Sequence, residues 1–299
     1  MPDPRPDPPD LRRMLAAVGV ERFFADYWQR RTLALALEVE NFARILDEVG
    51  PLDIARFTGL AREGAQAWVA NDYIAHSVIP VDAPNAEKLF GIGATLYFIN
   101  VPIDRLTHSL ADFLGAPRQK VIASLFLTPS TGGASAHFDK NENFTIQLTG
   151  AKRWIVGEFP TVASPPDGYM LGQTIPPSLK NLLGEAAEQP NQTVDMRPGT
   201  LLYVPRGTVH RTEAGEVSWS LNLSYSPSMW LDLVKVGLQR QLAASARWRG
   251  TVTGVGKACD PAAREANRLP ELIAELRETL ADPDELDKLC RAFLDYPDG

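Results

Sequence analysis

The sequence predicts a mainly β fold, a sandwich or barrel, with helical regions on both sides of it. Between about residues 91 and 226, short runs of β-branched and aromatic residues alternate with turns that contain glycine or proline. Many short strands of this kind are typical of a sandwich or barrel. Outside this region, apolar residues recur at three- and four-residue spacing, which indicates amphipathic helices. The chain has 299 residues, 44% of them hydrophobic, and this is enough for a substantial core.

The N-terminal part is predicted to be mostly helical. Residues 1–10 (MPDPRPDPPD) combine prolines with charges and should form a disordered tail. Residues 11–90 form the predicted helical region, with one helix in LRRMLAAVGVERFFADYWQ, a second near 40–48 and a third near 60–70 (LAREGAQAWVA).

The central part, residues 91–226, is the predicted barrel. Its strand-like runs are GIGATLYFINV, VIASLFLTP, NFTIQLTG, KRWIVGE, TLLYVP and VSWSLNLSY, and one more helix is expected at 103–114. The short turn Thr149-Gly150-Ala151 predicts that the strand starting at Lys152 pairs antiparallel with NFTIQL. Residues 160–195 are rich in proline, so we expect a long irregular insertion there.

The C-terminal part, residues 227–299, returns to helical spacing in WLDLVKVGLQRQLAASARW, LPELIAELRETLA and ADPDELDKLCRAFL. In the last of these, Asp282 is a predicted N-cap, Pro283 suits the first turn and Glu285 completes a capping box. We therefore expect a helical region after the barrel.

Composition excludes several classes of protein. The net charge of −7 and the pI of about 5.2 argue against a nucleic-acid binder. No apolar run approaches the roughly 20 residues that span a bilayer, and the N-terminus lacks the apolar stretch of a signal peptide. Cys259 and Cys290 have no CxxC spacing, so we expect reduced thiols in a cytoplasmic protein, with a single disulfide as the alternative.

One motif suggests a metal site. On a strand, residues two apart point to the same face, so His137 and Asp139 in SAHFDKNENF can converge on one ion. His210 follows a Pro-Gly turn and an apolar strand in PGTLLYVPRGTVH and is the candidate third ligand. Two histidines and one carboxylate form the facial triad of non-haem Fe(II) oxygenases. A lone HxD arises often by chance, and the two other histidines, His76 and His108, lack this spacing and are expected to be structural or surface groups.

The surroundings of the motif favour a functional site. From Asn143 onward, polar residues (Asn143, Thr145, Gln147) alternate with apolar ones (Phe144, Ile146, Leu148), as in a wall with one wet and one dry face. The run 218–225 alternates in the same way. Lys152 begins the next strand. A lysine inside a barrel requires an anion, which a dicarboxylate cosubstrate would supply, and the alternative is a surface lysine at a turn.

These segments resemble a known family. HFDKNENFTIQLTGAKRW resembles the core of JmjC-type, cupin-fold 2-oxoglutarate oxygenases. VIASLFLTPSTGGASAHFD and MRPGTLLYVPRGTVHRTEA are similar to the flanking segments of its ribosomal-oxygenase and asparaginyl-hydroxylase-like branch, and FFADYWQRRTLAL resembles the short motif before the barrel. The likeness covers about residues 20–226. It implies a double-stranded β-helix (jelly-roll, cupin) core.

The resemblance also implies roles for particular residues. It assigns His137, Asp139 and His210 to Fe(II), and Lys152 to the distal carboxylate of 2-oxoglutarate. Three further polar residues are expected near the cosubstrate: Asn143, Asn222 and Ser124. Four residues are expected to line the substrate path: Tyr97, Asn100, Arg206 and Arg211. Ala134 departs from relatives that have a threonine there.

The function that follows is an Fe(II)- and 2-oxoglutarate-dependent hydroxylase of an amino-acid side chain in a protein or peptide. A free amino acid or small natural product is the alternative substrate, because only about seventy residues follow the barrel, fewer than ribosomal oxygenases carry there. Lysine demethylation is less favoured, since no reader domain is evident. A catalytically silent cupin that acts as a binding module is the alternative of another class. We expect no nucleic-acid or membrane partner, and the C-terminal helices are candidates for a homodimer.

Overall fold

The structure is a computed structural model that describes residues 10–68, 78–183, 190–251 and 269–294. The chain divides into two compact units, residues 1–227 and 228–299. The first contains both β-sheets and the second contains three described helices. His76 and Cys259 lie outside the described residues.

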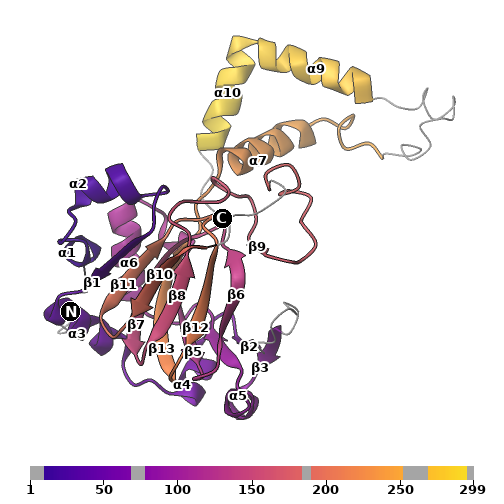
Figure 1. The fold of residues 1–299 in the computed structure, drawn as a ribbon. Coiled ribbons are helices and arrows are strands. Elements are labelled where there is room, and N and C mark those ends of the chain that lie inside the picture. The colour runs from indigo at the N-terminus through magenta and orange to yellow at the C-terminus, as the bar shows by residue number, and fades with distance from the viewer. Residues whose placement is uncertain (1–9, 69–77, 184–189, 252–268, 295–299) are drawn as a thin grey trace, which may run out of the picture. The chain divides into compact units, whose positions relative to one another are not determined.

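The first unit is built on two antiparallel sheets (Figure 1). The larger sheet has eight strands in the order β1 (Leu33–Ala36), β11 (Thr200–Val204), β7 (Glu142–Thr149), β13 (Ser218–Tyr225), β5 (Val121–Thr128), β4 (Thr95–Phe98), β2 (Ala65–Trp68), β3 (Val78–Val81). The smaller has five in the order β10 (Gln192–Met196), β8 (Lys152–Val156), β12 (His210–Ala214), β6 (Gly133–Phe138), β9 (Tyr169–Met170). The predicted mainly β core with flanking helices is confirmed.

The predicted hairpin between the strands on either side of Gly150 is wrong. β7 pairs with β11 and β13 in the larger sheet, whereas β8 pairs with β10 and β12 in the smaller one. Gly150 has φ 63°, and a Cβ there would lie 2.2 Å from the carbonyl oxygen of Val217, so the chain turns tightly beside β13 as it leaves the larger sheet. The crossing puts Lys152 on the sheet that faces β7.

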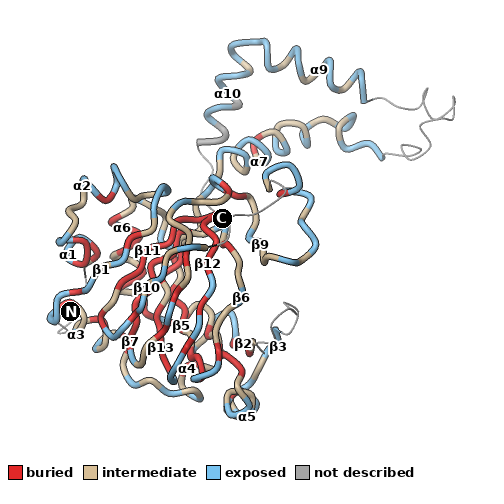
Figure 2. Tube along the Cα trace, in the orientation of Figure 1, coloured by how far each residue is buried: buried red, intermediate tan, exposed pale blue. Residues whose placement is uncertain are grey.

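The alternation along β7 and β13 divides their side chains as the sequence predicts. Phe144, Ile146 and Leu148 are buried in the main hydrophobic core, between the larger sheet and the N-terminal helices. Asn143 and Thr145 line a pocket on the other face. Buried residues accordingly follow the strands of both sheets (Figure 2). The polar face of the larger sheet therefore faces the smaller sheet.

The N-terminal region contains strands as well as helices. The single helix expected at 11–29 is broken: α1 (Leu11–Met14) is followed by a turn, α2 (Val20–Arg22) and a π-helical turn, Phe23–Tyr27. Gly19, with φ 86°, interrupts the helix. The helix expected at 60–70 is also wrong, because α4 (Ile54–Leu60) ends and β2 follows. There Ala65 and Ala67 alternate with less buried neighbours, so pairing with β3 and β4 overrides the helical propensity of alanine.

Two other predicted helices are confirmed, whereas α5 (Ala83–Gly91) lies outside the predicted ones. The confirmed helices are α3 (Val39–Val49) and α6 (Asp104–Leu114), and α5 begins at an Asp82 N-cap. The 160–195 segment is irregular in its described part, apart from β9 and the start of β10. His108 is half-buried on α6.

The second unit contains α7 (Trp230–Ala243), α9 (Leu269–Ala281) and α10 (Pro283–Leu294). Asp282 caps α10 as predicted, because its Oδ1 accepts from the backbone N of Asp284 at 2.9 Å and of Glu285 at 3.4 Å. Cys290 is an exposed free thiol. Among the described residues, every helix is too short or too polar to cross a bilayer.

Phe23 holds the N-terminal segment on the larger sheet. It is fully buried, and its ring centroid lies 5.1 Å from that of Tyr203 and 6.0 Å from that of Phe144. We expect Phe23→Ala to lower the free energy of unfolding by about 3–5 kcal/mol, because it leaves a cavity in an aromatic cluster. Urea denaturation would measure this. Phe159→Ala removes a ring that is 56% exposed and should change stability little; equal losses in both variants would contradict the prediction.

Candidate metal centre and its pocket

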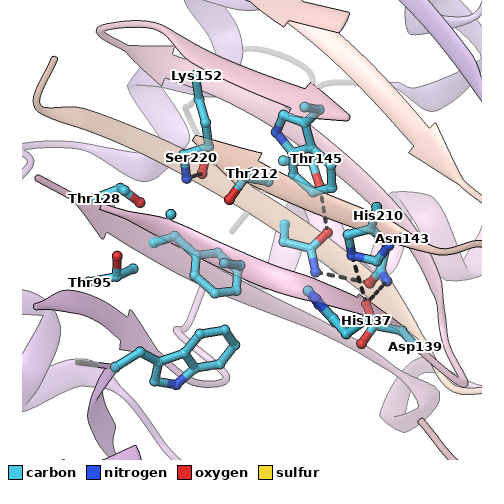
Figure 3. A pocket seen from close by; sticks show the side chains of 16 residues that line it. Thr95, Thr128, His137, Asp139, Asn143, Thr145, Lys152, His210, Thr212 and Ser220 are labelled. Atoms are coloured by element: carbon cyan, nitrogen blue, oxygen red, sulfur yellow. Dashed lines mark hydrogen bonds and ion pairs between the residues drawn. The ribbon is translucent and has the colours of Figure 1, made fainter. Parts of the chain in front are cut away.

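The three predicted ligands meet at one end of the smaller sheet. His137 is near the end of β6, Asp139 follows that strand directly, and His210 opens β12. His210 and His137 are register partners in the antiparallel pair, with ring centroids 4.2 Å apart. Figure 3 shows the three side chains pointing toward one another. Among the described residues, they are the group of histidine and acidic side chains whose spacing suits a metal ion.

Both imidazoles are oriented by the backbone. The Nδ1 of His137 lies 2.6 Å from the carbonyl oxygen of Ser135, and the Nδ1 of His210 lies 2.9 Å from that of Thr208. A carbonyl only accepts, so each Nδ1 carries the proton and each Nε2 is left with a free lone pair. Burial, together with the neighbouring His137, lowers the pKa of His210 to about 4. His210 is therefore neutral at physiological pH, as metal binding requires.

The ligand spacing fits a transition-metal ion. Metals bind nitrogen and oxygen at about 2.0–2.2 Å, so two ligand atoms of one ion lie at most about 4.4 Å apart. His210 Nε2 and Asp139 Oδ2, 3.7 Å apart, lie inside this limit. The ligand atoms of all three residues lie within 4.8 Å of one another, so a shift of a few tenths of an ångström brings the whole set within reach of one ion. Two neutral imidazoles and one carboxylate suit Fe(II) and leave other coordination positions open.

A hydrogen-bond chain fixes the carboxylate of Asp139. Asn143 Nδ2 donates to Asp139 Oδ2 at 2.7 Å, and Asn143 Oδ1 accepts from Asn222 Nδ2 and from Ser224 Oγ, both at 3.0 Å. Thr145 Oγ1 donates to Asn222 Oδ1 at 3.1 Å. The chain runs across β7 and β13 and sets the direction of the carboxylate, as partners of metal ligands do in other sites.

Lys152 lies at the other end of the same pocket. Its side chain is inside the barrel and 5% exposed, so the surface alternative is excluded. Nζ donates to Ser220 Oγ at 3.3 Å and lies 5.8 Å from the ring centroid of Phe126. Among the described residues, no carboxylate forms an ion pair with it, and burial lowers the pKa of Lys152 to about 7. An unpaired ammonium in such a place is costly without an anion.

Further donors of the pocket lining have no partner in the part of the chain that the structure describes. Among the described residues, four pocket-lining side chains have a buried donor that makes no hydrogen bond: Thr95, Thr128, Trp68 and Trp154. Thr95 and Thr128 lie on adjacent strands, one step beyond the paired residues Leu96 and Leu127. Trp154 stacks on His210, with ring centroids 5.3 Å apart, so these donors are spread along the pocket. Buried donors are rarely left unpaired, and the pocket is therefore suited to a ligand with several acceptor oxygens.

The pocket is open at the metal end and closed at the lysine end. The space between its walls is about 540 Å³, part of which is open solvent at the mouth. Asp139 keeps 39% of its side chain exposed, whereas Lys152 is buried behind Ser220 and Phe126. Figure 3 shows Lys152 and Ser220 at a distance from the triad, along one face of the strands.

Two of the three residues expected near the cosubstrate line the pocket, and the third, Ser124, does not. Asn143 and Asn222 line the pocket. Ser124 is fully buried and accepts a hydrogen bond from the backbone N of Asn100 at 3.3 Å, and it is not among the lining residues. Ala134 also lines the pocket.

The predicted substrate residues lie outside the pocket wall. Tyr97 stacks on Phe126, with centroids 4.4 Å apart, and Phe126 itself forms the wall. Asn100 Nδ2 donates to Glu63 at 2.8 Å. Arg206 is buried beside Glu142, and Arg211 is paired with Glu213 at the surface. Their roles toward a substrate stay predictions.

Several pocket residues escaped the sequence interpretation. Trp68 lies in a segment expected to be helical, and Thr95 and Thr128 lie at strand ends without a motif. Glu142, which does not line the pocket, is a buried polar residue that the sequence could have revealed. It shares the apolar parity of Phe144 and Ile146, and a carboxylate on a dry face implies a buried partner.

Comparisons with known proteins agree with this geometry. Residues 97–233 match the family model described as the JmjC domain. The Bacillus subtilis protein named "Uncharacterized protein YxbC" is 26% identical over 258 residues, which cover 80% of this chain and 77% of that protein. "Bifunctional lysine-specific demethylase and histidyl-hydroxylase NO66" of Drosophila mojavensis is 26% identical over 76% of this chain. The match covers 26% of that relative, so the chain spans about a quarter of its length.

A solved structure shares the fold. The ribosomal oxygenase YcfD from Escherichia coli, in complex with cobalt and 2-oxoglutarate, aligns with a TM-score of 0.54 and 19% sequence identity. The alignment covers 93% of this chain and 71% of that one. At this identity the likeness shows a common architecture alone.

Proposed function

We propose, because this chain is a JmjC-domain protein, that it is an Fe(II)- and 2-oxoglutarate-dependent hydroxylase of an amino-acid side chain in a protein or peptide. The observation that carries the proposal is one pocket with a metal triad at its open end and an unpaired buried ammonium at its closed end. A dicarboxylate would place one end on the metal and the other on Lys152.

Bound Fe(II) and 2-oxoglutarate would supply the chemistry: O₂ is consumed, the cosubstrate is converted to succinate and CO₂, and a substrate C–H bond is hydroxylated. The chain holds the groups in place. The carbonyls of Ser135 and Thr208 keep Nε2 of both histidines free, and Asn143 directs Asp139. We propose a cytoplasmic location, where Fe(II) and the thiols stay reduced.

The side chains around Lys152 are suited to bind a carboxylate group. The ammonium of Lys152 and the hydroxyls of Ser220, Thr128 and Thr95 are all donors that line one pocket, and a carboxylate accepts about four hydrogen bonds. Phe126 and Trp154 form apolar walls between this end and the metal. They exclude water, which strengthens the charge-assisted contact.

The substrate would approach at the metal end. Residues of the 160–195 insertion, Val162 and Leu179, form a buried cluster with Phe138 and Val209, which are sequence neighbours of His137 and His210. The insertion therefore borders the metal site and can contact a bound peptide. The relatives' names, a ribosomal oxygenase and a histidyl-hydroxylase, favour a protein substrate.

A free amino acid or small natural product is the second candidate substrate. The match covers only about a quarter of the NO66 relative, so the substrates in that relative's name do not by themselves decide between the two classes. A silent binding module is disfavoured, because the triad is complete and the ammonium is unpaired.

The test is succinate release from 2-oxoglutarate with Fe(II) and O₂, with and without peptide or amino-acid pools. Turnover without substrate, or turnover stimulated by one pool, supports the oxygenase and identifies the substrate class. Co(II) binding without succinate under any of these conditions would reject the hydroxylase in favour of a binding module.

We also propose that the C-terminal helices pair two copies of the chain. α7 and α9 expose Trp230 (80%), Leu269 and Ile273, and Gly237 is the buried residue of α7. Exposed apolar groups of this size favour self-association. We expect light scattering to give the mass of a dimer, and the double variant Trp230→Ser/Ile273→Ser to give a monomer. A monomeric wild type would contradict this.

A further inference from the structure

A buried ion pair joins the two segments that carry the metal ligands. Glu142 stands three residues after Asp139, and Arg206 stands four residues before His210. Glu142 Oε1 and Arg206 Nε lie 3.4 Å apart, with the Glu142 side chain fully buried and that of Arg206 10% exposed. The backbone N of Arg206 also donates to Glu142 Oε2 at 3.3 Å. The pair therefore spans the gap between β7 and the turn that leads to β12.

Main-chain contacts lie beside this pair. The backbone N of Gly207 donates to the carbonyl oxygen of Asp139 at 2.8 Å, so the residue after Arg206 touches a ligand residue directly. The backbone N of Thr161 donates to the carbonyl oxygen of Gly207 at 2.8 Å. A Cβ on Gly207 would lie 1.8 Å from the carbonyl oxygen of Val162, so this turn has no room to shift toward the 157–168 loop. A displacement at Arg206 would thus be transmitted to Asp139 and His210.

Two residues with positive φ, Gln29 and Ser164, are hydrogen-bonded to the network around Glu142 and Arg206. Tyr203 Oη donates to Glu142 Oε2 at 2.7 Å and accepts from the backbone N of Gln29 at 2.8 Å. Arg206 Nη2 donates to Ser164 Oγ at 2.9 Å. Gln29 has φ 58° and Ser164 has φ 50°, a region that side chains other than glycine rarely adopt. Such strain persists where the surroundings fix the conformation, and it gathers at functional sites.

We propose that Glu142 and Arg206 are positioning residues that set the spacing between Asp139 and His210. Gln29 and Ser164, through Tyr203 and Arg206, brace the pair from the N-terminal segment and from the 157–168 loop. Neither charged side chain touches the metal ligands' donor atoms, so they act through the backbone. The inference rests on the proposed function only for the identity of the metal.

The test is the affinity of the metal-free protein for Co(II), with the Co(II) absorption spectrum as a second readout. Glu142→Gln keeps the size of the side chain and removes its charge. We expect roughly 10- to 100-fold weaker Co(II) binding and an altered spectrum, as for other changes behind metal ligands. Wild-type affinity and spectrum in this variant would overturn the proposal.

Glu48→Gln is the matched control. Glu48 on α3 faces Arg105 on α6 at the same 3.4 Å and with comparable burial, away from the metal pocket. We expect this variant to lose stability and to keep the Co(II) affinity of the wild type. Equal losses of affinity in both variants would show a general effect of destabilisation and would overturn the proposal.

The double variant Glu142→Gln/Arg206→Met separates positioning from stability, and it carries the test if the single variant does not fold. Removing both charges leaves no unpaired buried ion, so the Tm should return toward that of the wild type. We expect Co(II) binding to stay weak. Recovery of affinity together with the Tm would reject positioning. Because Co(II) binding needs no cosubstrate, this result and the succinate assay can fail independently.

Discussion

Asp139→Ala should abolish succinate production from 2-oxoglutarate. The variant removes the single carboxylate of the triad. It also removes the oxygen that accepts the 2.7 Å hydrogen bond from Asn143 Nδ2. Changes behind metal ligands already cost roughly 10- to 100-fold, so the loss of a ligand should exceed 100-fold. Succinate formation with saturating Fe(II) measures it, and Co(II) titration should show weaker binding.

A surface carboxylate provides the comparison. Asp195 on β10 is exposed and pairs with Arg153 at 2.9 Å, on the outside of the smaller sheet. Asp195→Ala changes the net charge by the same amount and should keep the activity of the wild type. If Asp139→Ala produced succinate at the rate of Asp195→Ala, the assignment of the metal site would be wrong.

The alternation of polar and apolar residues was the most informative signal in the sequence. It predicts which side chains of β7 enter the core, and it places Asn143 on the opposite face, which lines the pocket with His137 and Asp139. These predictions succeed because a strand has a fixed period of two residues. The structure pairs His210 with His137 across two neighbouring strands. The sequence motif alone does not predict this pairing, and only the family resemblance suggests it.

The connections were harder to predict than the strands. A three-residue turn with glycine is compatible with a hairpin and with a crossing to the other sheet, and long-range pairing of β8 with β10 and β12 decides between them. The same holds for β2, whose alanines favour a helix until β3 and β4 supply partners. This error concealed Trp68, which forms part of the pocket wall.

Lys152→Met should weaken 2-oxoglutarate binding while leaving metal binding intact. The variant keeps most of the side-chain volume and removes the ammonium that lies 3.3 Å from Ser220 Oγ. A hydrogen bond to a charged group contributes about 1.5–3 kcal/mol, so the KM for 2-oxoglutarate should rise roughly 10- to 100-fold. Co(II) affinity should not change. Lys88→Ala, on the exposed side of α5, is the control and should leave the KM unaltered.

Lys152→Met should raise the thermal stability of the protein without 2-oxoglutarate, although it weakens 2-oxoglutarate binding. Burial lowers the pKa of Lys152 to about 7, so between that value and the usual pKa of lysine the unfolded chain binds more protons than the folded one. The folded state therefore gains stability as the pH rises through this window, and it bears the cost of the buried charge below it. Lys152→Met removes that cost, so at pH 6.5 the variant without 2-oxoglutarate should be more thermally stable than the wild type.

The pH dependence of binding gives the sharpest test of the lysine. A dicarboxylate binds the protonated ammonium, so above pH 7 the empty protein must take up a proton on binding. The affinity of the wild type for 2-oxoglutarate, measured calorimetrically with Co(II) bound, should fall between pH 7 and pH 9 by at most about tenfold per pH unit. In Lys152→Met the same titration should be flat and weak across this range. A wild-type affinity that is independent of pH, or a variant that keeps the slope, would show that another group holds the distal carboxylate.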